Sequence, residues 1–566
     1  MALRWNLRAL PSLDALEKIC GDLGISRELG ILLLQRGLHD FETARRYFTP
    51  EETPLHDPFA MADMSKAVDR LEQARQLGER IMVFGDYDVD GTTSVALVAD
   101  CLQQLDLPFC TYIPDRYAEG YGLSDAGMHQ AQAWGCSLVI ALDCGIKGHP
   151  QVALANSLGL DMIICDHHQP GPTLPPAHAV LDPKRADCAY PFKELSGCGV
   201  GFKLMQAWYQ RMGKADETLW PLLDLLAVSI AADIVPMVGE NRVLMARGLQ
   251  LINEKPRTGL RALMAFSAQK ERLTTEDVVF QIAPRINAAG RIEHGKLAVE
   301  LLTTRSADRA AELAEHINQL NSERKGHDET IAEEALELLQ GTASQFTSVV
   351  YQPHWHKGVI GIAASRLIET HYRPTIVLTR SGDVLAGSAR SVHGFDLYTA
   401  IDACREHLIQ FGGHAFAAGM TLRPEQLEGF KQAFEQSVRE RIREEQRHPH
   451  ITIDLRIEAD KLTRRFYNSL LRMGPFGPQN LMPVLACFQL KDRGYSRTVG
   501  TDHKHLKVSL VDRNGIALEG IAFGMASALP MLQNGWVDVA FTLDLNVWNG
   551  KERLQLNVKA IRPSIE

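Results

Sequence analysis

Residues 80–170 alternate short apolar runs with amphipathic segments, and this alternation constrains the fold more than any other feature of the sequence. The apolar runs are RIMVFGD, FCTYIPD, SLVIALD and DMIICDHH. The segments between them, TTSVALVADCLQQL, LSDAGMHQAQAWG and HPQVALANSLG, have the length of helices. Strands that alternate with helices in this way are typical of βαβ units and a parallel sheet. We therefore predict an α/β fold.

The predicted strands share a second property, because each of them ends in acidic or histidine side chains. Asp86, Asp115 and Asp143 follow three of the runs, and the triplet Asp166, His167 and His168 follows the fourth. Ligands of open parallel sheets bind beyond the carboxyl ends of the strands. The sequence therefore predicts the active site at this edge of the sheet.

The chain of 566 residues is too long for a single core, and its patterns suggest several domains. A polar, helical stretch runs from about Lys296 to Leu339, and the last 116 residues alternate as about five strands of a small antiparallel barrel. We predict a parallel-sheet lobe, a long helical connector, a second α/β lobe and a C-terminal OB-like β-barrel. The expected boundaries are 1–60 for an N-terminal helical segment, 61–240 for the metal-binding lobe, 241–340 for the connector, 341–425 for the second lobe, 426–450 for a spacer helix and 451–566 for the barrel.

Composition points to a cytoplasmic protein that does not enter a membrane. The longest apolar stretch, Leu225 to Ile234, contains Asp233 and falls short of the roughly 18 residues of a membrane span. The N-terminus lacks a signal-peptide pattern, and the ten Cys include no C-x-x-C pair. The net charge is −9, but residues 451–566 carry 15 Lys and Arg against 11 Asp and Glu, a net of +4. A polyanionic partner and a chance distribution of surface charge are equally good explanations.

The segment GDYDVDGTTS places three carboxylates, those of Asp86, Asp88 and Asp90, in one turn between a strand and a helix. Three carboxylates so close together repel one another, so an ordered turn needs a cation, hydrogen-bond donors or water. A calcium loop would require Glu at the twelfth position, where the chain has Leu97, and a phosphate-binding loop would require a Lys. A catalytic metal site is the interpretation that remains.

Further ligands for that site are Asp143, His167 and Asp233, the last at the end of a predicted buried helix. A carboxylate-rich set with one imidazole suits Mn²⁺ or Mg²⁺ better than zinc. Several anionic ligands indicate two ions, which would activate a water and bind the attacking and leaving oxygens of a phosphoryl centre. His168 is a candidate contact of the scissile phosphate, although a structural histidine is the alternative.

Four ordered motifs, FGDYDVDG, ALDCG, ICDHHQ and AADIVPM, resemble those of the DHH phosphoesterases. The motifs IPDRYAEGYGLS, APRINAAGRI, WHKGVIGIAASRL, GSARSVHGFDL and GGHAFAAGM resemble the branch of that family formed by bacterial single-strand-specific DNA exonucleases. The resemblance implies metal ligation by Asp86, Asp88, Asp90, Asp143, His167 and Asp233, with Asp166 and His168 as catalytic residues. The family often has a His where this chain has Phe84, so completion of the second metal site stays open.

The resemblance also implies a 5′-phosphate pocket formed by Arg116, Ser388 and Arg390. Two guanidinium groups and a hydroxyl can hold a terminal phosphate and fix the first linkage at the metals. Residues Arg285, Asn287 and Arg291 resemble residues that face the cleft, with structural hydrogen bonding as an equal alternative. His414 lies in a glycine-rich segment that could approach a phosphate or base, and it could equally be a packed histidine.

The predicted barrel carries basic residues around one aromatic side chain, namely Lys491, Arg493, Tyr495, Arg497, Lys504 and Lys507. Barrels of this type bind single strands by a basic groove and aromatic stacking, and a solvated charged face is the alternative.

The resulting hypothesis is a single-stranded-DNA exonuclease that releases 5′-mononucleotides in the 5′ to 3′ direction with Mn²⁺ or Mg²⁺, in DNA recombination, repair and mismatch repair. The family further implies single-strand-binding protein and a helicase as partners. One alternative is a DHH hydrolase of short oligonucleotides or small phosphoesters, which would not need the barrel. The other is a non-catalytic single-strand-binding scaffold at the replication fork, which would tend to lose the acidic ligands.

Overall fold

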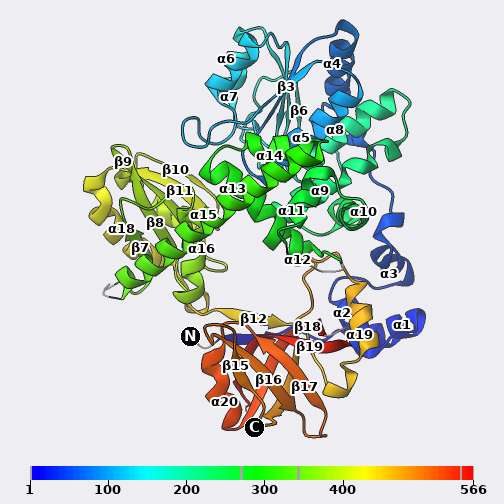
Figure 1. Ribbon diagram of the computed structural model, residues 1–566, viewed down its shortest axis with the longest axis vertical. Helices are drawn as coiled ribbons and strands as arrows, with labels where there is room; N and C mark the ends of the chain where they lie inside the picture. Colours follow the sequence, from blue (N-terminus) through cyan, green and yellow to red (C-terminus); the bar gives the residue numbers. More distant parts are fainter. Residues whose placement is uncertain (1–2, 268–271, 341–343, 549–550, 565–566) are drawn as a thin grey trace. The chain divides into compact units, whose positions relative to one another are not determined.

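The computed structural model describes residues 3–267, 272–340, 344–548 and 551–564 (Figure 1). Contacts within the chain define two compact units. One unit spans Pro54–Arg447, and the other combines the two ends of the chain, Met1–Thr53 and His448–Glu566. No helix of the described ranges is both long and apolar enough to cross a membrane.

The first lobe of the large unit is built on a five-stranded sheet in the order β3-β2-β4-β5-β6, and every neighbouring pair is parallel. This confirms the predicted parallel sheet. The order reverses between β2 and β4, because β3 lies on one side of β2 and the later strands lie on the other. The strands are β2 (Ile81–Gly85), β3 (Phe109–Tyr112), β4 (Leu138–Leu142), β5 (Asp161–Cys165) and β6 (Ala179–Leu181).

Helices cover both faces of this sheet. Alternate strand residues pack on one face against α4 (Met64–Leu77), α5 (Val89–Gln104), α8 (Gly197–Arg211) and α9 (Leu223–Ala232), and on the other against α6 (Asp125–Ala133) and α7 (His149–Ser157). Side-chain caps begin several of these helices: Asp88 caps α5, Ser124 caps α6 and Ser196 caps α8. The mostly apolar α9 is buried and ends next to Asp233, as predicted, and its two polar side chains are Asp224 and Ser229.

Helices continue from this lobe to the second one. They are α10 (Gly239–Glu254), α11 (Thr258–Met264), α12 (Thr275–Asp277), the π-helical turn Val278–Ile282, α13 (Ala283–Ile292), α14 (Lys296–Thr303) and α15 (Ala307–Leu339). The prediction of one helix from Lys296 to Leu339 was wrong. Thr304 is extended (φ −64°, ψ 138°) and Ser306 caps a new helix, so the stretch is divided in two.

The second lobe contains a mixed sheet in the order β10-β11-β9-β8-β7, in which only β7 and β8 are parallel. Its helix α18 (Leu427–Arg441) was expected as a spacer, but it buries Phe430, Phe434 and Val438 in the core of the lobe. The other elements are β7 (Ser348–Tyr351), α16 (Ile360–Thr370), β8 (Thr375–Ser381), β9 (Val384–Arg390), α17 (Leu397–Asp402), β10 (Gln410–Gly413) and β11 (Ala417–Leu422).

The small unit contains the expected barrel. Pairing of β14 with β16 closes a ring of five strands, but β17 and β19 are parallel, so the barrel is not wholly antiparallel. Its strands are β14 (Leu485–Asp492), β15 (Arg497–Val499), β16 (His505–Val511), β17 (Ala517–Ala522), β18 (Trp536–Trp548) and β19 (Lys551–Pro563), with the two-residue β13 (Leu455–Arg456) beside β14.

The N-terminal segment belongs to the same unit as the barrel. Its first element is the strand β1 (Arg4–Leu7), which pairs in parallel with β12 (His450–Ile453) and which the sequence did not predict. The helices α1 (Leu13–Leu23) and α2 (Arg27–Leu34) bury leucines in the hydrophobic core of the barrel. Three further helices, α3 (Phe41–Phe48), α19 (Arg464–Leu471) and α20 (Leu529–Gln533), complete the unit.

Candidate functional site

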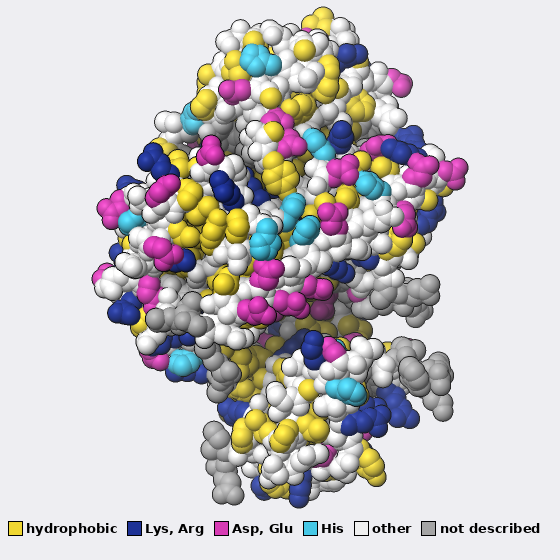
Figure 2. Space-filling view, turned by 60° about the vertical axis from the view of Figure 1, so that its left-hand side comes forward, with side chains coloured by type: hydrophobic (Ala, Val, Ile, Leu, Met, Phe, Trp, Pro, Cys, Tyr) yellow, Lys and Arg dark blue, Asp and Glu magenta, His cyan; other side chains and the backbone are white. Residues whose placement is uncertain are grey.

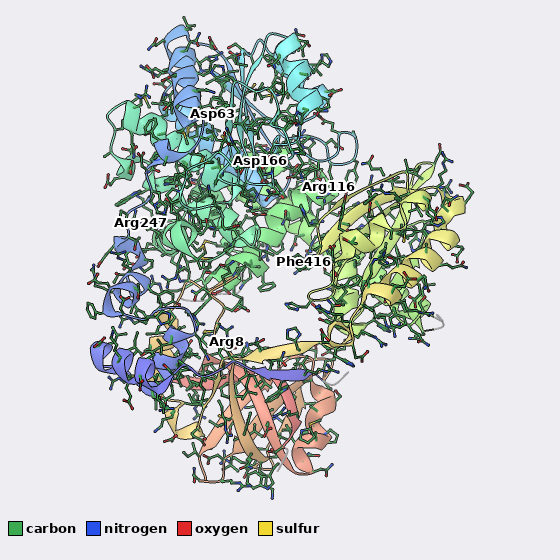
Figure 3. All side chains as sticks on the ribbon, turned by 180° about the vertical axis from the view of Figure 1, so that it is seen from behind. Arg8, Asp63, Arg116, Asp166, Arg247 and Phe416 are labelled. Atoms are coloured by element: carbon green, nitrogen blue, oxygen red, sulfur yellow. The ribbon has the colours of Figure 1, made fainter. Side chains whose placement is uncertain are left out.

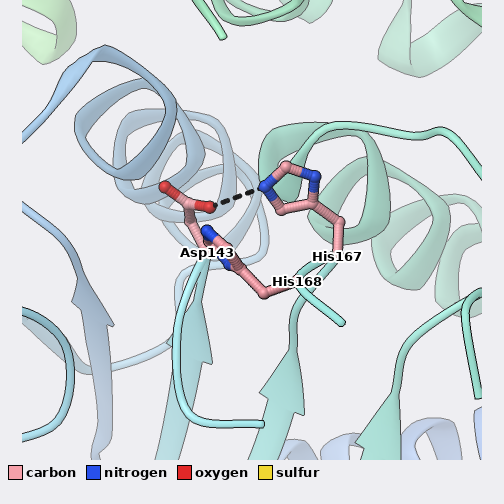
Figure 4. A group of neighbouring side chains, drawn as sticks. All are labelled: Asp143, His167 and His168. Carbon is pink, nitrogen blue, oxygen red and sulfur yellow. Dashed lines mark ion pairs between the residues drawn. The ribbon is translucent and has the colours of Figure 1, made fainter. Parts of the chain in front are cut away.

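Acidic side chains and one imidazole converge where the order of the parallel sheet reverses, the position at which ligands bind in such sheets. His167 Nε2 lies 3.2 Å from Asp143 Oδ1, 3.6 Å from Asp233 Oδ2 and 3.7 Å from Asp90 Oδ2. Figure 4 shows Asp143 and His167 approaching each other from the ends of adjacent strands, with His168 beside them. The structure thus brings together four of the six predicted ligands in direct contact.

Asp90 is held rigidly by the beginning of α8. Its carboxylate accepts hydrogen bonds from Gly197 N (2.6 Å), Cys198 N (2.9 Å) and Ser229 Oγ (2.6 Å). Backbone N–H groups at a helix N-terminus favour a negative charge. A side chain at Gly197 would place Cβ 2.5 Å from Asp143 Cβ, so this position requires glycine for the close approach of α8 to the cluster.

Asp86 and Asp143 differ from Asp90 because they lack such support, whereas Asp88 accepts one backbone hydrogen bond, from Gly91 N (3.1 Å). Both carboxylate oxygens of Asp86 and Oδ1 of Asp143 are buried without a hydrogen-bond partner, and Asp143 has a left-handed backbone (φ 60°). Burial, together with repulsion between neighbouring carboxylates, raises the pKa of Asp86, Asp88, Asp143 and Asp233 above the usual range.

Asp166 and His168 form a separate, fully bonded pair at the edge of this cluster. Asp166 accepts hydrogen bonds from three backbone N–H groups and lies 2.8 Å from His168 Nδ1. These bonds outweigh burial and lower the pKa of Asp166 to about 2, and the carboxylate raises the pKa of His168 to about 9. His168 Nε2 is 3.2 Å from the hydroxyl of Tyr121, which in turn donates to Asp143 O. The imidazolium therefore presents a fixed positive charge beside the acids.

The chemistry of these donors fits divalent cations. Two sets of side-chain atoms are each close enough together to hold one ion, namely Asp143, His167 and His168, and Asp90, His167 and Asp233. Neither ring nitrogen of His167 has a hydrogen-bond partner, and burial lowers the pKa of His167, which keeps the ring neutral as a ligand must be. A cation would relieve the repulsion that raises the pKa values of the acids.

Phe84 occupies the position at which relatives often have histidine, and it has a packing role. Its ring is fully buried and stacks on Tyr112 at 5.3 Å between ring centres. The side chain therefore contributes no ligand to the cluster.

A second site lies next to the acidic cluster, in a cavity of about 630 Å³ between the first and second lobes of the large unit. Its lining includes four cations and no acid: Arg116, Arg291, Lys357 and Arg390, with Ser388 and three tyrosines, Tyr87, Tyr117 and Tyr121. Figure 3 shows Arg116 at the margin of the first lobe that faces the second. The predicted phosphate residues Arg116, Ser388 and Arg390 are thus brought together.

Local contacts position these cations. The guanidinium group of Arg116 lies 4.4 Å above the ring of Tyr87, and Arg390 Nη1 donates to Ser388 Oγ (3.0 Å). Arg291 Nη1 donates to Gly358 O (2.9 Å), and its pKa is lowered to about 10 by burial and by neighbouring arginines. Among the described residues, no carboxylate forms an ion pair with Arg116, Arg291 or Arg390. A half-buried cluster of guanidinium groups without carboxylate partners calls for an anionic ligand.

Other predicted site residues lie outside both sites. Arg285 donates to Asn318 Oδ1 (3.0 Å), Phe266 O (2.6 Å) and Gln281 O, so its donors fix helices rather than face the cavity. Asn287 and His414 do not line the cavity, and His414 is exposed. Sequence reasoning missed Lys357, Tyr87 and Tyr121, although the last two stand beside the motif residues Asp86 and Gly122.

The barrel presents its predicted basic residues to solvent. All five cations and Tyr495 are exposed, and Arg497 pairs with Lys507 across β15 and β16, which places two like charges side by side. Figure 2 shows dark-blue Lys and Arg side chains with few magenta ones over the face of the barrel that it presents. Two aromatic residues of the barrel are also exposed. Tyr495 is 69% exposed, and Phe523, which was not predicted, is 60% exposed.

Comparison with known protein families identifies the class of protein to which this chain belongs. The chain matches the DHH family N-terminal domain over residues 80–230, the DHHA1 domain over residues 343–440 and the RecJ OB domain over residues 453–560. It is thus a DHH-family protein with the associated second domain and an OB domain.

Relatives define the family more narrowly. The chain is 36% identical to the single-stranded-DNA-specific exonuclease RecJ of Bacillus subtilis over 98% of this chain and 70% of that protein. It is 35% identical to RecJ of Escherichia coli over 89% of this chain and 91% of that protein. The crystal structure of RecJ from Thermus thermophilus in complex with Mn²⁺ superposes with a TM-score of 0.86 at 26% identity, covering 100% of this chain and 80% of that one. The chain belongs to the RecJ family.

Proposed function

We propose that this protein is a single-stranded-DNA-specific exonuclease that hydrolyses phosphodiester bonds in the 5′ to 3′ direction and releases 5′-mononucleotides. DNA recombination and repair, including mismatch repair, are the processes that this activity serves. The observation that carries the proposal is the adjacency of two groups in the described part of the chain: an acidic cluster whose carboxylates form no ion pair with Lys or Arg, and an arginine pocket whose guanidinium groups form no ion pair with a carboxylate. The first suits divalent cations and the second suits a terminal phosphate.

The acidic cluster suits two divalent cations, either Mn²⁺ or Mg²⁺, as cofactors. Asp86, Asp88, Asp90, Asp143, His167 and Asp233 would hold them. When bound, such ions polarise the phosphate and lower the pKa of a bound water, which supplies a nucleophile at neutral pH.

The chain's own residues then perform binding and orientation. Arg116, Arg390 and Ser388 hold the 5′-phosphate by charge-assisted hydrogen bonds, which fixes the first linkage next to the acidic cluster. His168, protonated at neutral pH through its bond to Asp166, donates from Nε2 toward the scissile phosphate and stabilises the charge that develops there. Arg291 adds a further positive charge to the wall of the pocket.

The barrel binds the strand outside the active site through Lys491, Arg493, Arg497, Lys504 and Lys507, with bases stacking on Tyr495. Binding of this kind tracks the backbone and tolerates any sequence. We retain the predicted domain boundaries as proposals except for the spacer at 426–450, whose helix α18 belongs to the core of the second lobe. A cytoplasmic location, and single-strand-binding protein and a helicase as partners, are proposals as well. Co-purification of the tagged chain with each of these partners, with and without DNA, tests the last point.

The deciding experiment uses one strand labelled at its 5′ end or at its 3′ end, incubated with Mn²⁺, Mg²⁺ or chelator. The expected result is early release of the 5′ label as a mononucleotide, and none with chelator. Asp143→Ala and Asp88→Ala should abolish cleavage while strand binding persists, and Asp69→Ala, an exposed residue of the same lobe, is the matched control. Retained turnover in Asp143→Ala would refute the metal assignment, and faster cleavage of a dinucleotide than of a long strand would favour a small-phosphoester hydrolase.

A further inference from the structure

The cavity that holds the arginine pocket is larger and more positive than a terminal monophosphate requires. Its volume of about 630 Å³ falls within the range of pockets for whole small molecules. Arg116, Arg291, Arg390 and Lys357 give its lining four positive charges, and none of its lining residues is acidic. A monophosphate carries at most two negative charges at neutral pH, so it would neutralise only half of the four positive charges of the lining.

The floor of the cavity is formed by the part of the second lobe's sheet that α16 does not cover. Val377 of β8 is covered by α16, whereas Ser388, in register with Val377 on β9, lines the cavity. Across the sheet Ser388 pairs with Gly419, and Gly419 pairs with Gly412. A Cβ at Gly412 would meet nothing within 4 Å and one at Gly419 only Gly387 O at 4.0 Å, so open space lies above both glycines.

The floor continues along β9 with small side chains. Two residues before Ser388, Ala386 pairs with Thr421, which pairs with Gln410, and all three line the cavity. The open floor is therefore three strands wide, roughly 10 Å at the usual strand spacing. Polar atoms of Thr421 and Gln410 stand at its border.

Lys357 stands at the far end of this floor. It is exposed, and Lys357 Nζ lies 3.3 Å from Ser381 Oγ, whose residue pairs with Val384 of β9. Val384 precedes Ser388 by four residues, so the ammonium group lies on the order of 13 Å along the strand from the level of Ser388. Arg390 and Ser388 thus mark one end of a shallow trough, and Lys357 marks the other.

We infer that this trough accepts a strand whose 5′ end carries a triphosphate, with Lys357 as the residue that binds the outer phosphates. The inference rests on the proposed function, because the inner phosphate occupies the Arg116, Ser388 and Arg390 site in both cases. The two outer phosphates lie over the small residues of β9 and β11 and reach Lys357. Such ends arise when a polymerase begins a strand from a nucleoside triphosphate.

The reaction on such an end is the same hydrolysis. Water attacks the phosphorus of the first internucleotide linkage, the bond from that phosphorus to the 3′ oxygen breaks, and the oxygen takes a proton. The first product is therefore a nucleoside 5′-triphosphate, and the shortened strand keeps a 5′-monophosphate. No phosphoanhydride bond is broken, so no pyrophosphate is released.

The test compares one DNA sequence with a 5′-hydroxyl, a 5′-monophosphate and a 5′-triphosphate, with the products separated by anion exchange. We expect kcat/KM for the triphosphate end to lie within about threefold of that for the monophosphate end, with nucleoside triphosphate as the first product. Lys357→Gln should lower kcat/KM for the triphosphate end about tenfold more than kcat/KM for the monophosphate end, as expected for one charge-assisted contact that only the outer phosphates make. Lys431→Gln, at a partly exposed lysine of the same lobe that forms an ion pair with Glu428, is the matched control.

Three results would overturn the inference: cleavage of the triphosphate end no faster than of the hydroxyl end, release of pyrophosphate, or an equal effect of Lys357→Gln on all ends. Failure of the monophosphate strand to be degraded from its 5′ end would instead refute the proposed function. Since Lys357 is exposed, a folded variant is expected, and an unfolding temperature equal to that of the parent chain checks this independently of activity.

Discussion

Asp182 is a buried acid whose replacement by asparagine should stabilise the large unit at neutral and alkaline pH but not at acidic pH. It follows β6 and is fully buried. Its Oδ1 accepts a hydrogen bond from Lys184 N (2.7 Å), whereas Oδ2 has no partner. Burial raises the pKa of Asp182 to about 7, and the nearby charge of Asp166 contributes to the rise.

The sign of the effect follows from the direction of this shift. Between pH 4 and pH 7 the folded chain holds a proton on Asp182 that the unfolded chain has released, so stability falls as the pH rises through that interval. A shift of roughly 3 pKa units corresponds to at most about 4 kcal/mol. Asparagine removes the buried charge and keeps the acceptor for Lys184, but its amide group lacks an acceptor, which costs about 1–3 kcal/mol. The net gain at pH 8.5 is therefore about 1–3 kcal/mol.

Thermal unfolding of Asp182→Asn and the parent chain at pH 5 and pH 8.5, with chelator present, measures this difference. We expect a rise of the unfolding temperature by roughly 1–4 °C at pH 8.5 and no rise at pH 5. Asp69→Asn, at an exposed ion pair with Arg211, is the control and should change little at either pH. An equal change at both pH values, or none at pH 8.5, would refute the assignment of a costly buried charge.

Three further predictions concern the two sites and the barrel. Gly197→Ala should displace Asp143 and lower kcat about 100-fold with weaker Mn²⁺ binding by calorimetry, whereas Gly21→Ala, with open space around it, should be neutral. Arg390→Gln should raise KM about tenfold for strands with a 5′-phosphate, and an equal increase for strands with a 5′-hydroxyl would contradict the phosphate role. Lys507→Glu should weaken strand binding and reduce its salt dependence in a fluorescence titration, with the cleavage of a dinucleotide unchanged as the control.

The parallel sheet and its acidic edge could be predicted because both depend on local sequence. Four of its five strands are the apolar runs of the prediction, and Asp86, Asp143 and Asp166 come directly after β2, β4 and β5, whereas the three-residue β6 was not predicted. The parallel strand β1 could not be predicted, because its pairing depends on a distant part of the chain and not on local sequence. Arg4–Leu7 has no alternating pattern of burial, and its partner β12 lies almost 450 residues away in the chain.

Side-chain partners were the least predictable feature of the site. Arg285 and Arg291 stand in one motif and both carry guanidinium groups, yet Arg285 is bonded to Asn318 and Phe266 while Arg291 lines the cavity. Six residues along a helix place them on different sides, and only the packing of α13 decides which side faces the pocket. Lys357 was missed because its distance from Ser388 depends on the register of β8 and β9.

Tyr87 explains how the two sites keep a fixed separation. It stands between Asp86 and Asp88 in sequence, and its ring lies beneath the guanidinium group of Arg116. Gly290 and Gly295 let helices α13 and α14 press closely on the backbone and Cβ of Tyr87. The contact of Arg116 with the Tyr87 ring therefore links one arginine of the phosphate pocket to the turn that carries two acids of the metal cluster. An enzyme that removes one nucleotide at a time must hold the terminal phosphate and the scissile phosphate at a constant spacing. A ring that buttresses the first while its neighbours face the second fulfils that requirement without any movement of either lobe.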